Sequence, residues 1–173
     1  VYKRQSYGYL ADKLGKKEIA GQYTQKAKEM AVEWERMAND GDHYKLTFDK
    51  SGTWSQKYNL VWDKLMNWQI FPEQIVKTEI PYYLTKQNRY GLPLDNRQTY
   101  TKTDWIMWTA TLAPDKATFE EFIEPVYLFM NETTDRIPMS DWVFTDKPEH
   151  RAFQARSVVG GYFIKMLENK MNN

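Results

Sequence analysis

Residues 16–38, KKEIAGQYTQKAKEMAVEWERMA, decide the fold class of this chain. Apolar side chains recur there at every third or fourth position, at Ile19, Tyr23, Ala27, Met30, Trp34 and Met37. This spacing places them on one stripe along a helix of about six turns. We therefore expect one long helix whose apolar stripe is buried against a neighbour.

Helical periodicity continues through most of the remaining sequence. We expect five further helices, over residues 55–68, 72–86, 103–112, 114–130 and 155–168. Pro81 lies inside the second of these and should kink or divide it. A brief alternation over residues 43–48 indicates a short strand, and residues 87–100 and 131–151 are expected to form irregular loops. Six helices with alternating short and long connections predict an all-α fold of stacked αα-hairpins.

Composition excludes several classes of protein. The 24 Lys and Arg balance 23 Asp and Glu at a net charge of +1, so no basic excess indicates a nucleic-acid partner. Cysteine is absent, which excludes disulfides, Cys-ligated zinc and thiol nucleophiles. No apolar run approaches the roughly 18 residues that a membrane helix needs. We expect no nucleic-acid partner, no membrane partner and no metal or other cofactor.

Aromatic side chains are frequent and lie beside polar ones. Tyr, Phe and Trp make up 16% of the chain, and Tyr and Trp often line wet clefts that bind sugars or small polar ligands. Polar–aromatic clusters occupy residues 54–64, 90–105 and 136–157. In the first cluster, helical spacing places Asn59 and Asp63 on one face beside Trp62. We expect these clusters to build a small-molecule site.

Five motifs in these clusters carry a resemblance to a known family. They are KYNLVWDK at residues 57–64, YGLPLD at 90–95, YTK and a following Trp at 100–105, SDW at 140–142 and ARSVVGG at 155–161. With these motifs the chain resembles, from about Gly8 to Leu167, the C-terminal part of the fungal and Bacteroidetes glutaminase A-like proteins. One departure is Asn96, where Ser is expected, but the flanking Asp95 and Arg97 are kept.

The resemblance implies an (α/α)6 toroid of the six-hairpin glycosidase kind. Such a toroid takes about twelve helices, whereas the sequence predicts six. Residues 1–173 would then form a single all-α domain that makes about half of a toroid. The chain would be a C-terminal fragment of a larger multidomain protein, with the remaining domains as its partners. The resemblance also implies a secreted or periplasmic protein, although this chain carries no signal segment.

The activity that the resemblance implies is hydrolysis of the side-chain amide of L-glutamine to glutamate and ammonia. That reaction needs a nucleophile and a proton donor for the departing ammonia. Without cysteine, the nucleophile is a Ser or Thr hydroxyl, or a water activated by a carboxylate. The candidates for base, acid or ammonium partner are Asp63, Asp95, Asp104 and Asp141.

Free glutamine is a zwitterion, so its site also needs a cation for the α-carboxylate. The planar guanidinium of arginine suits that role because it binds a carboxylate bidentately. The candidates for substrate contact are Arg97, Arg136, Arg156, Lys57, Asn59, Trp62 and Trp105.

Most of these candidates also have a structural alternative. Asp104 fits an N-cap, while Asp95 and Asp141 fit turns in loops. The arginines fit ion pairs that hold loops down, and Trp at helical spacing is common in cores. The adjacent Gly160 and Gly161 indicate close approach of the backbone to a neighbouring helix.

Two other functions stay open. An inverting glycoside hydrolase is the first, because six-hairpin toroids host such enzymes and the Asp and Trp residues could supply its acid, base and sugar-stacking groups. A non-catalytic helical binding module is the second. An apolar seam exposed on half a toroid would also favour a homodimer.

Overall fold

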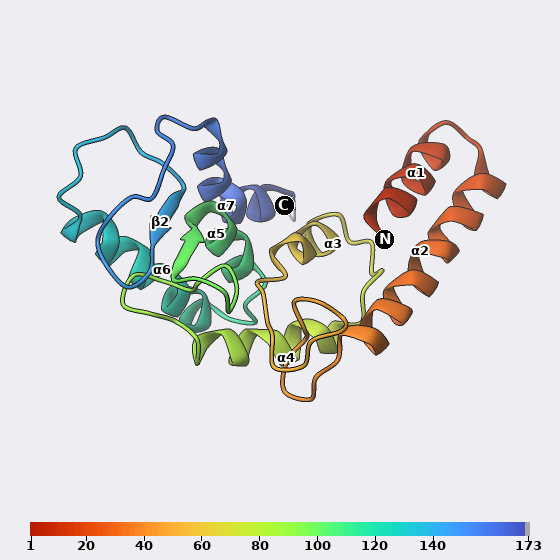
Figure 1. Cartoon of the computed structure of the whole chain (residues 1–173). Helices are drawn as coiled ribbons and strands as arrows, with labels where there is room; N and C mark the ends of the chain where they lie inside the picture. Colours follow the sequence, from red (N-terminus) through yellow and green to blue (C-terminus); the bar gives the residue numbers. More distant parts are fainter. Residues whose placement is uncertain (172–173) are drawn as a thin grey trace.

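The computed structural model describes residues 1–171 and confirms an all-α protein (Figure 1). Within these residues the helices are α1 (Tyr2–Lys13), α2 (Lys17–Ala38), α3 (Val61–Leu65), α4 (Glu73–Leu84), α5 (Thr103–Thr111), α6 (Lys116–Glu132) and α7 (Ile164–Met171). Two 3-10 segments are η1 (Tyr58–Leu60) and η2 (Ser157–Phe163). The strands are β1 (Tyr100–Lys102) and β2 (Trp142–Phe144).

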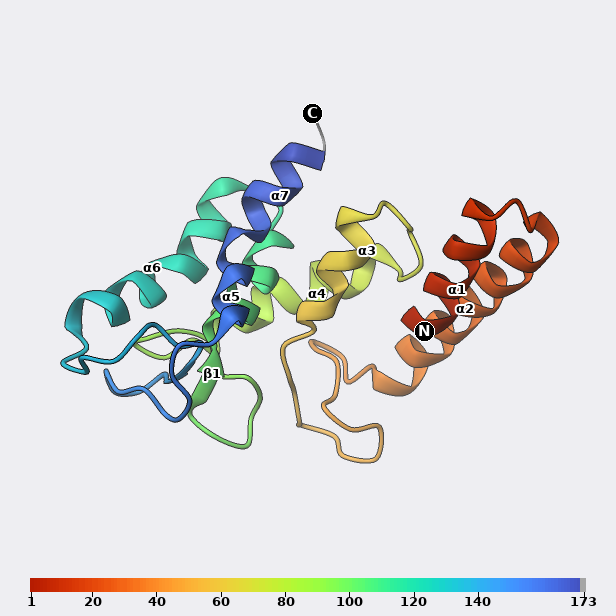
Figure 2. The ribbon, with the colours of Figure 1, turned by 90° about the horizontal axis from the view of Figure 1, so that it is seen from above.

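α1 and α2 form a helical hairpin at one end of the molecule, away from α6 and the sheet (Figure 1, Figure 2). α2 confirms the long helix expected over residues 16–38. Gly8 lets the two helices lie close together, since a Cβ there would be 2.8 Å from Thr24 Oγ1. The sequence does not predict α1, because its buried residues, Gln5, Gly8 and Ala11, are polar or small and form no apolar stripe.

The segment after the hairpin is irregular. The prediction of a strand over residues 43–48 is wrong. This segment contains only an isolated bridge, between Tyr44 and Asn39. The Tyr44 N–H donates to the Glu79 carboxylate at 2.9 Å. The Glu79 side chain thus accepts the N–H that would otherwise donate to a neighbouring strand, so Tyr44 is not part of a sheet. The helix expected over residues 55–68 is shortened to η1 and α3.

Two helices differ from expectation for local backbone reasons. α3 ends at Leu65, and the left-handed backbone of Asn67 (φ 49°) prevents its continuation. α4 runs through Pro81 as one helix, so the prediction that this residue divides it is wrong. Proline removes a single N–H there, and the buried Ile80 and Tyr83 side chains hold the helix in the core.

The main core lies between α3, α4, α5 and α6. Val61, Ile75, Ile106 and Phe122, one from each helix, are fully buried in the same apolar cluster. α6 begins with a side-chain N-cap from Asp115, as expected for a helix that opens at this residue. The core therefore fixes the position of α5, whose first turn carries candidate site residues.

The small sheet joins two loops that are far apart in the sequence. β1 and β2 pair antiparallel, with Lys102 opposite Trp142. Periodicity does not predict them, because three residues are too few to show alternation. β1 leads directly into α5, and η2 packs against α5. The helix expected over residues 155–168 is instead η2 followed by α7.

Candidate functional site

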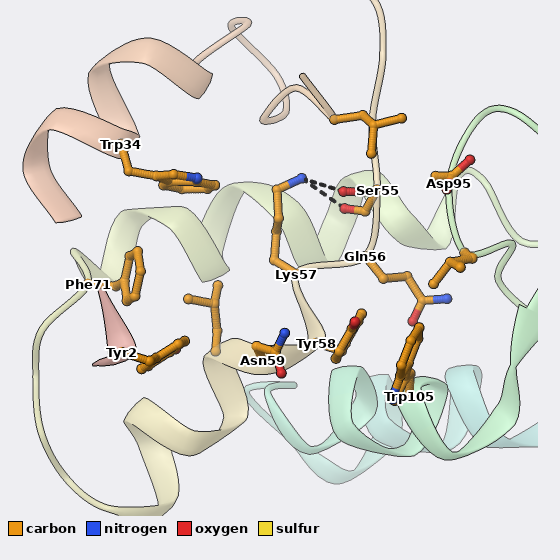
Figure 3. A pocket seen from close by; sticks show the side chains of 13 residues that line it. Tyr2, Trp34, Ser55, Gln56, Lys57, Tyr58, Asn59, Phe71, Asp95 and Trp105 are labelled. Carbon is orange, nitrogen blue, oxygen red and sulfur yellow. Dashed lines mark hydrogen bonds between the residues drawn. The ribbon is translucent and has the colours of Figure 1, made fainter. Parts of the chain in front are cut away.

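A cleft of about 350 Å³ opens between the α1–α2 hairpin and α5, and we call it the aromatic cleft (Figure 3). Its lining comes from the hairpin, the segment between α2 and α3 that includes η1, the α3–α4 connection, the loop between α4 and β1 and the first turn of α5. The side chains include Tyr2, Trp34, Lys57, Tyr58, Asn59, Phe71, Asp95 and Trp105. Four of the candidates predicted from the sequence, Lys57, Asn59, Asp95 and Trp105, thus line one cavity.

Two aromatic walls border the cleft (Figure 3). On one side the Tyr58 and Trp105 rings stack with their centres 4.0 Å apart. On the other side the ring of Phe71 lies 5.7 Å from that of Trp34 and 5.5 Å from that of Tyr2, centre to centre. The stacked pair presents a flat face, whereas Phe71 meets Trp34 edge-on and Tyr2 at a tilt. Aromatic walls of this kind suit a small ligand with apolar faces and polar edges.

Polar side chains lie between these walls (Figure 3). The Lys57 ammonium donates to the carbonyl oxygens of Tyr44 and Ser55 at 2.9 Å each, and lies 3.6 Å from the Glu79 carboxylate. Burial lowers the pKa of Lys57, and the Glu79 charge opposes that effect. Lys57 therefore lines the cleft, but its ammonium group is already hydrogen-bonded and ion-paired within the protein. Asn59, by contrast, is exposed in the cleft.

A second group of side chains, which we call the acid cluster, consists of Asp104, Asp141, Lys102 and Arg156. Asp104 and Asp141 are only 4% and 2% exposed. Asp141 Oδ2 lies 2.9 Å from Lys102 Nζ and 3.5 Å from Arg156 Nη1. Neither Oδ1 atom of the two aspartates has a hydrogen-bond partner within residues 1–171. The acid cluster therefore contains two buried carboxyl oxygens with unfilled hydrogen-bonding capacity.

The fold changes the proton affinity of Asp104. Burial raises the pKa of Asp104 to about 6, and the charge of Asp141 adds to this effect. Backbone N–H groups at the start of α5 and the charge of Lys102 act in the opposite direction, more weakly. A carboxyl with a pKa near 6 exchanges its proton close to neutral pH, as a general acid or base must.

The sheet and the start of α5 bring the acid cluster together. Because Lys102 stands opposite Trp142, the next residue on each side, Thr103 and Asp141, also meet. The Thr103 N–H donates to the Asp141 carbonyl oxygen at 2.8 Å, and the Thr103 hydroxyl donates to the same oxygen at 3.1 Å. The Tyr162 hydroxyl of η2 contacts the Thr103 hydroxyl in turn.

Asp104 is not an N-cap, so that structural alternative is wrong. α5 begins at Thr103, Lys102 occupies the cap position, and no side chain caps the helix. After burial, the charge of Asp104 is a further cause that raises the pKa of Tyr58, which lines the aromatic cleft. Trp105 follows Asp104 in the chain and lines the cleft as well. The acid cluster therefore adjoins the Tyr58–Trp105 wall.

Asp63 and Trp62 lie outside both groups. The Asp63 carboxylate accepts the Ile70 N–H at 3.1 Å and the Phe71 N–H at 3.0 Å. These hydrogen bonds hold the segment between α3 and α4 against the Asp63 side chain. Trp62 packs edge-to-face on Trp108, with ring centres 5.3 Å apart, and does not line the aromatic cleft. Asp63 thus supports the cleft wall through Phe71 rather than facing the cavity.

The three candidate arginines are all engaged with the protein. Arg97 forms a bidentate pair with Asp95, at 2.9 Å from Nε to Oδ1 and 2.6 Å from Nη2 to Oδ2. Arg136 donates to the Thr133 carbonyl oxygen at 3.2 Å and belongs to neither group described above. Arg156 is the arginine of the acid cluster, and its side chain is 35% exposed.

Trp108, Gly161 and Tyr162 adjoin the acid cluster, although sequence reasoning did not select them as site residues. Two of them, Gly161 and Tyr162, could have been selected from the sequence, because they end and directly follow the ARSVVGG motif. The close approach expected at the glycine pair is confirmed for Gly161, where a Cβ would lie 2.9 Å from both Asp104 Cβ and Trp108 Nε1. At Gly160 a Cβ would meet nothing within 4 Å, so the expectation is wrong for that residue.

Comparison with protein families matches residues 4–166 to the glutaminase A six helical-hairpin domain. The chain belongs to this family. Membership confirms the resemblance carried by the five motifs and agrees with the all-α fold. Six hairpins take about twelve helices, and residues 1–171 contain seven.

Two curated relatives match most of the chain. Glutaminase A of Aspergillus oryzae is 27% identical over 170 residues, which are 94% of this chain and 24% of that protein. A protein of Arthroderma benhamiae named "Probable glutaminase" is 26% identical over 174 residues, which are 82% of this chain and 20% of that protein. The chain thus spans a quarter or less of the length of these relatives. No solved structure gives a significant match.

Two general features of residues 1–171 complete the description. Their helices are all too short or too polar to pass through a membrane. Within the same residues, no three His, Asp or Glu side chains gather into a group that could hold a metal ion.

Proposed function

We propose that this chain forms part of a glutaminase, an amidohydrolase that converts the side-chain amide of L-glutamine to glutamate and ammonia. Family membership and the names of the two relatives support the proposal. The observation that carries it is Asp104, a buried carboxyl with its pKa raised to about 6, beside Asp141 and an open cleft.

The proposed chemistry follows from the proton affinity of Asp104. Hydrolysis joins the oxygen of water to the amide carbon and breaks the C–N bond, so that ammonia leaves. As a carboxylate, Asp104 takes a proton from the attacking water, and as a carboxylic acid it gives that proton to the departing nitrogen. A pKa near 6 keeps both forms accessible close to neutral pH. Proton transfer of this kind typically contributes ~10²–10⁴-fold to the rate.

The charged and apolar parts of glutamine match the two groups of side chains. Arg156 contacts Asp141 through one nitrogen at 3.5 Å, so its other N–H donors can bind the α-carboxylate. The unpartnered Asp141 Oδ1 suits the α-ammonium group. The Tyr58–Trp105 wall offers an apolar surface to the methylene groups, and the exposed Asn59 offers a hydrogen-bonding amide.

The test is ammonia release from L-glutamine by the complete protein, with Asp104→Asn beside the wild type. The amide fills the same space but cannot shuttle a proton, so we expect activity to fall by about 10²-fold or more. Asp146→Asn, which changes an exposed loop carboxyl, is the matched control and should retain activity. Absence of ammonia release by folded wild-type protein, or full activity of Asp104→Asn, would contradict the proposal.

One observation favours a second function, an inverting glycoside hydrolase. The aromatic walls of the cleft could stack on sugar rings, and a pair of carboxyl groups adjoins them. If L-glutamine is not hydrolysed, neutral glycosides are the next substrates to test with the same variants. Unchanged activity in both Asp104→Asn and Asp141→Asn would instead favour a non-catalytic binding module.

Partners and compartment are further proposals. We propose that the chain is part of a longer protein, because it covers so little of the length of its relatives. On the resemblance to the glutaminase A-like family, we propose further that the chain is the C-terminal part of that protein and that the protein is exported. Exposed apolar side chains, Leu10 on α1, Leu14 directly after it and Met166 on α7, would then pack against further hairpins of that protein. Light scattering tests the alternative, a homodimer of the 173-residue chain, and cell fractionation tests export.

A further inference from the structure

The 3-10 segment η2 lies directly on the side chain of Asp104. A Cβ built on Gly161 would be 2.9 Å from Asp104 Cβ, 3.6 Å from Asp104 Oδ2 and 2.9 Å from Trp108 Nε1. Distances below 3.0 Å leave no room for a side chain unless the neighbours move. The backbone of Gly161 is not left-handed, so its conformation does not call for glycine. The contact with Asp104 and Trp108 is therefore the reason for glycine at this position.

η2 covers a group that has unfilled hydrogen-bonding capacity. No residue of η2 is itself buried, whereas Asp104 beneath it is 4% exposed. Neither Asp104 Oδ1 nor Trp108 Nε1 has a partner within residues 1–171. Tyr162 ties the cover to the first residue of α5 through the hydroxyl of Thr103. Water would hydrate both unpartnered atoms if η2 moved away.

We propose that Gly161 is a positioning residue for Asp104, because it lets η2 rest on the carboxyl group as a cover that shields one side of it from bulk water. The importance of this cover for catalysis rests on the proposed function, in which Asp104 transfers protons. Its effect on the carboxyl group itself does not depend on any activity. Lifting the cover hydrates the carboxylate and favours the charged form of Asp104.

An added methyl group at Gly161 removes none of the other charged and titratable groups around Asp104, although Tyr162 and Arg156 move with η2. They are Asp141 before β2, Lys102 of β1, Tyr58 of η1 and Tyr162 of η2, with Arg156 paired to Asp141. Burial raises the pKa of Tyr162 to about 12 and also raises that of Tyr58, so both phenols are neutral where Asp104 titrates. Moving the positive charge of Arg156 away would raise the pKa of Asp104, so a lower pKa of Asp104 in a Gly161 variant reports its hydration.

The experiment is a carbon-13 NMR titration of the aspartate carboxyl groups of the chain, in which Asp104→Asn identifies the Asp104 signal. We expect Gly161→Ala to lower the pKa of Asp104 by at least one unit, because the new Cβ pushes η2 off the carboxyl group. Gly160→Ala is the matched control, since it adds the same methyl group to the same segment with nothing within 4 Å. That variant should leave the pKa of Asp104 unchanged.

A second variant decides the matter if Gly161→Ala does not fold, which circular dichroism would show. Tyr162→Phe removes the hydroxyl that ties η2 to Thr103 without adding bulk. It should lower the pKa of Asp104 in the same direction by a smaller amount. An unshifted Asp104 in the folded variants, or an equal shift in Gly160→Ala, would overturn the proposal. The NMR result stands even if the protein releases no ammonia, so the two proposals fail separately.

Discussion

The buried carboxyl of Asp104 should cost the chain stability at neutral pH, and Asp104→Asn should remove that cost. The fold raises the pKa of this group from 3.8 to about 6, mainly through burial. The folded chain therefore binds the Asp104 proton more tightly than the unfolded chain does. The stabilisation from this proton is fully present below about pH 3.8 and is lost as the pH rises through about 6.

The size of the effect follows from the shift in pKa. One unit corresponds to about 1.4 kcal/mol, so a shift of roughly two units gives about 3 kcal/mol over the whole titration. Somewhat more than 2 kcal/mol of this falls between about pH 4 and pH 7.5. Asparagine carries no charge at either pH. We therefore expect Asp104→Asn to be more stable than the wild type at pH 7.5, by about 1–3 kcal/mol, and to gain little at pH 4.

Urea unfolding of the 173-residue chain measures this difference. Tryptophan fluorescence at about pH 4 and pH 7.5 gives the free energy of unfolding of each variant. The change in the mutant-minus-wild-type difference between the two pH values isolates Asp104 from the other titrating groups. Asp146→Asn serves as the control, because its carboxyl is exposed in a loop.

Two results would refute this reasoning. One is a mutant-minus-wild-type difference that stays the same at both pH values, which would mean that Asp104 titrates alike in the folded and unfolded chain. The other is a lower stability of Asp104→Asn at pH 7.5, which would mean that the carboxylate makes favourable contacts in the folded chain. A stabilised but inactive variant would match the known conflict between active-site chemistry and stability.

Two further predictions concern residues that the sequence marked as candidates. Asp63→Ala should lower the free energy of unfolding by about 2–4 kcal/mol, since it leaves two backbone N–H groups without their carboxylate acceptor. Urea unfolding checks this value, and a loss below about 0.5 kcal/mol would contradict the structural role. Trp105→Ala should raise the KM of the complete protein about 2–10-fold, because it removes the ring stacked on Tyr58 in the cleft wall. Steady-state kinetics test it, and an unchanged KM would place the ligand elsewhere.

The candidate site shows where sequence reasoning succeeds and where it stops. Residues from different sequence motifs, such as Asn59 and Trp105, do reach one cleft. The motifs could not show that Asp63 turns toward the backbone of the α3–α4 connection, or that Asp95 holds Arg97. Those outcomes depend on which atoms lie within hydrogen-bonding distance, and spacing along the chain does not determine that for loops.

The sequence by itself determined the all-α class and the family. The apolar stripe of α2 depends only on residues three and four apart, and the motifs are strings of neighbouring residues, so both can be read without a fold. Only the tertiary structure decided that Asp104 exchanges its proton close to neutral pH. The pKa of Asp104 depends on its burial and on the charge of Asp141. Asp141, and Gly161 that lies on Asp104, are both far from it in sequence. Desolvation and Coulomb interaction act through space, and folding alone creates those distances.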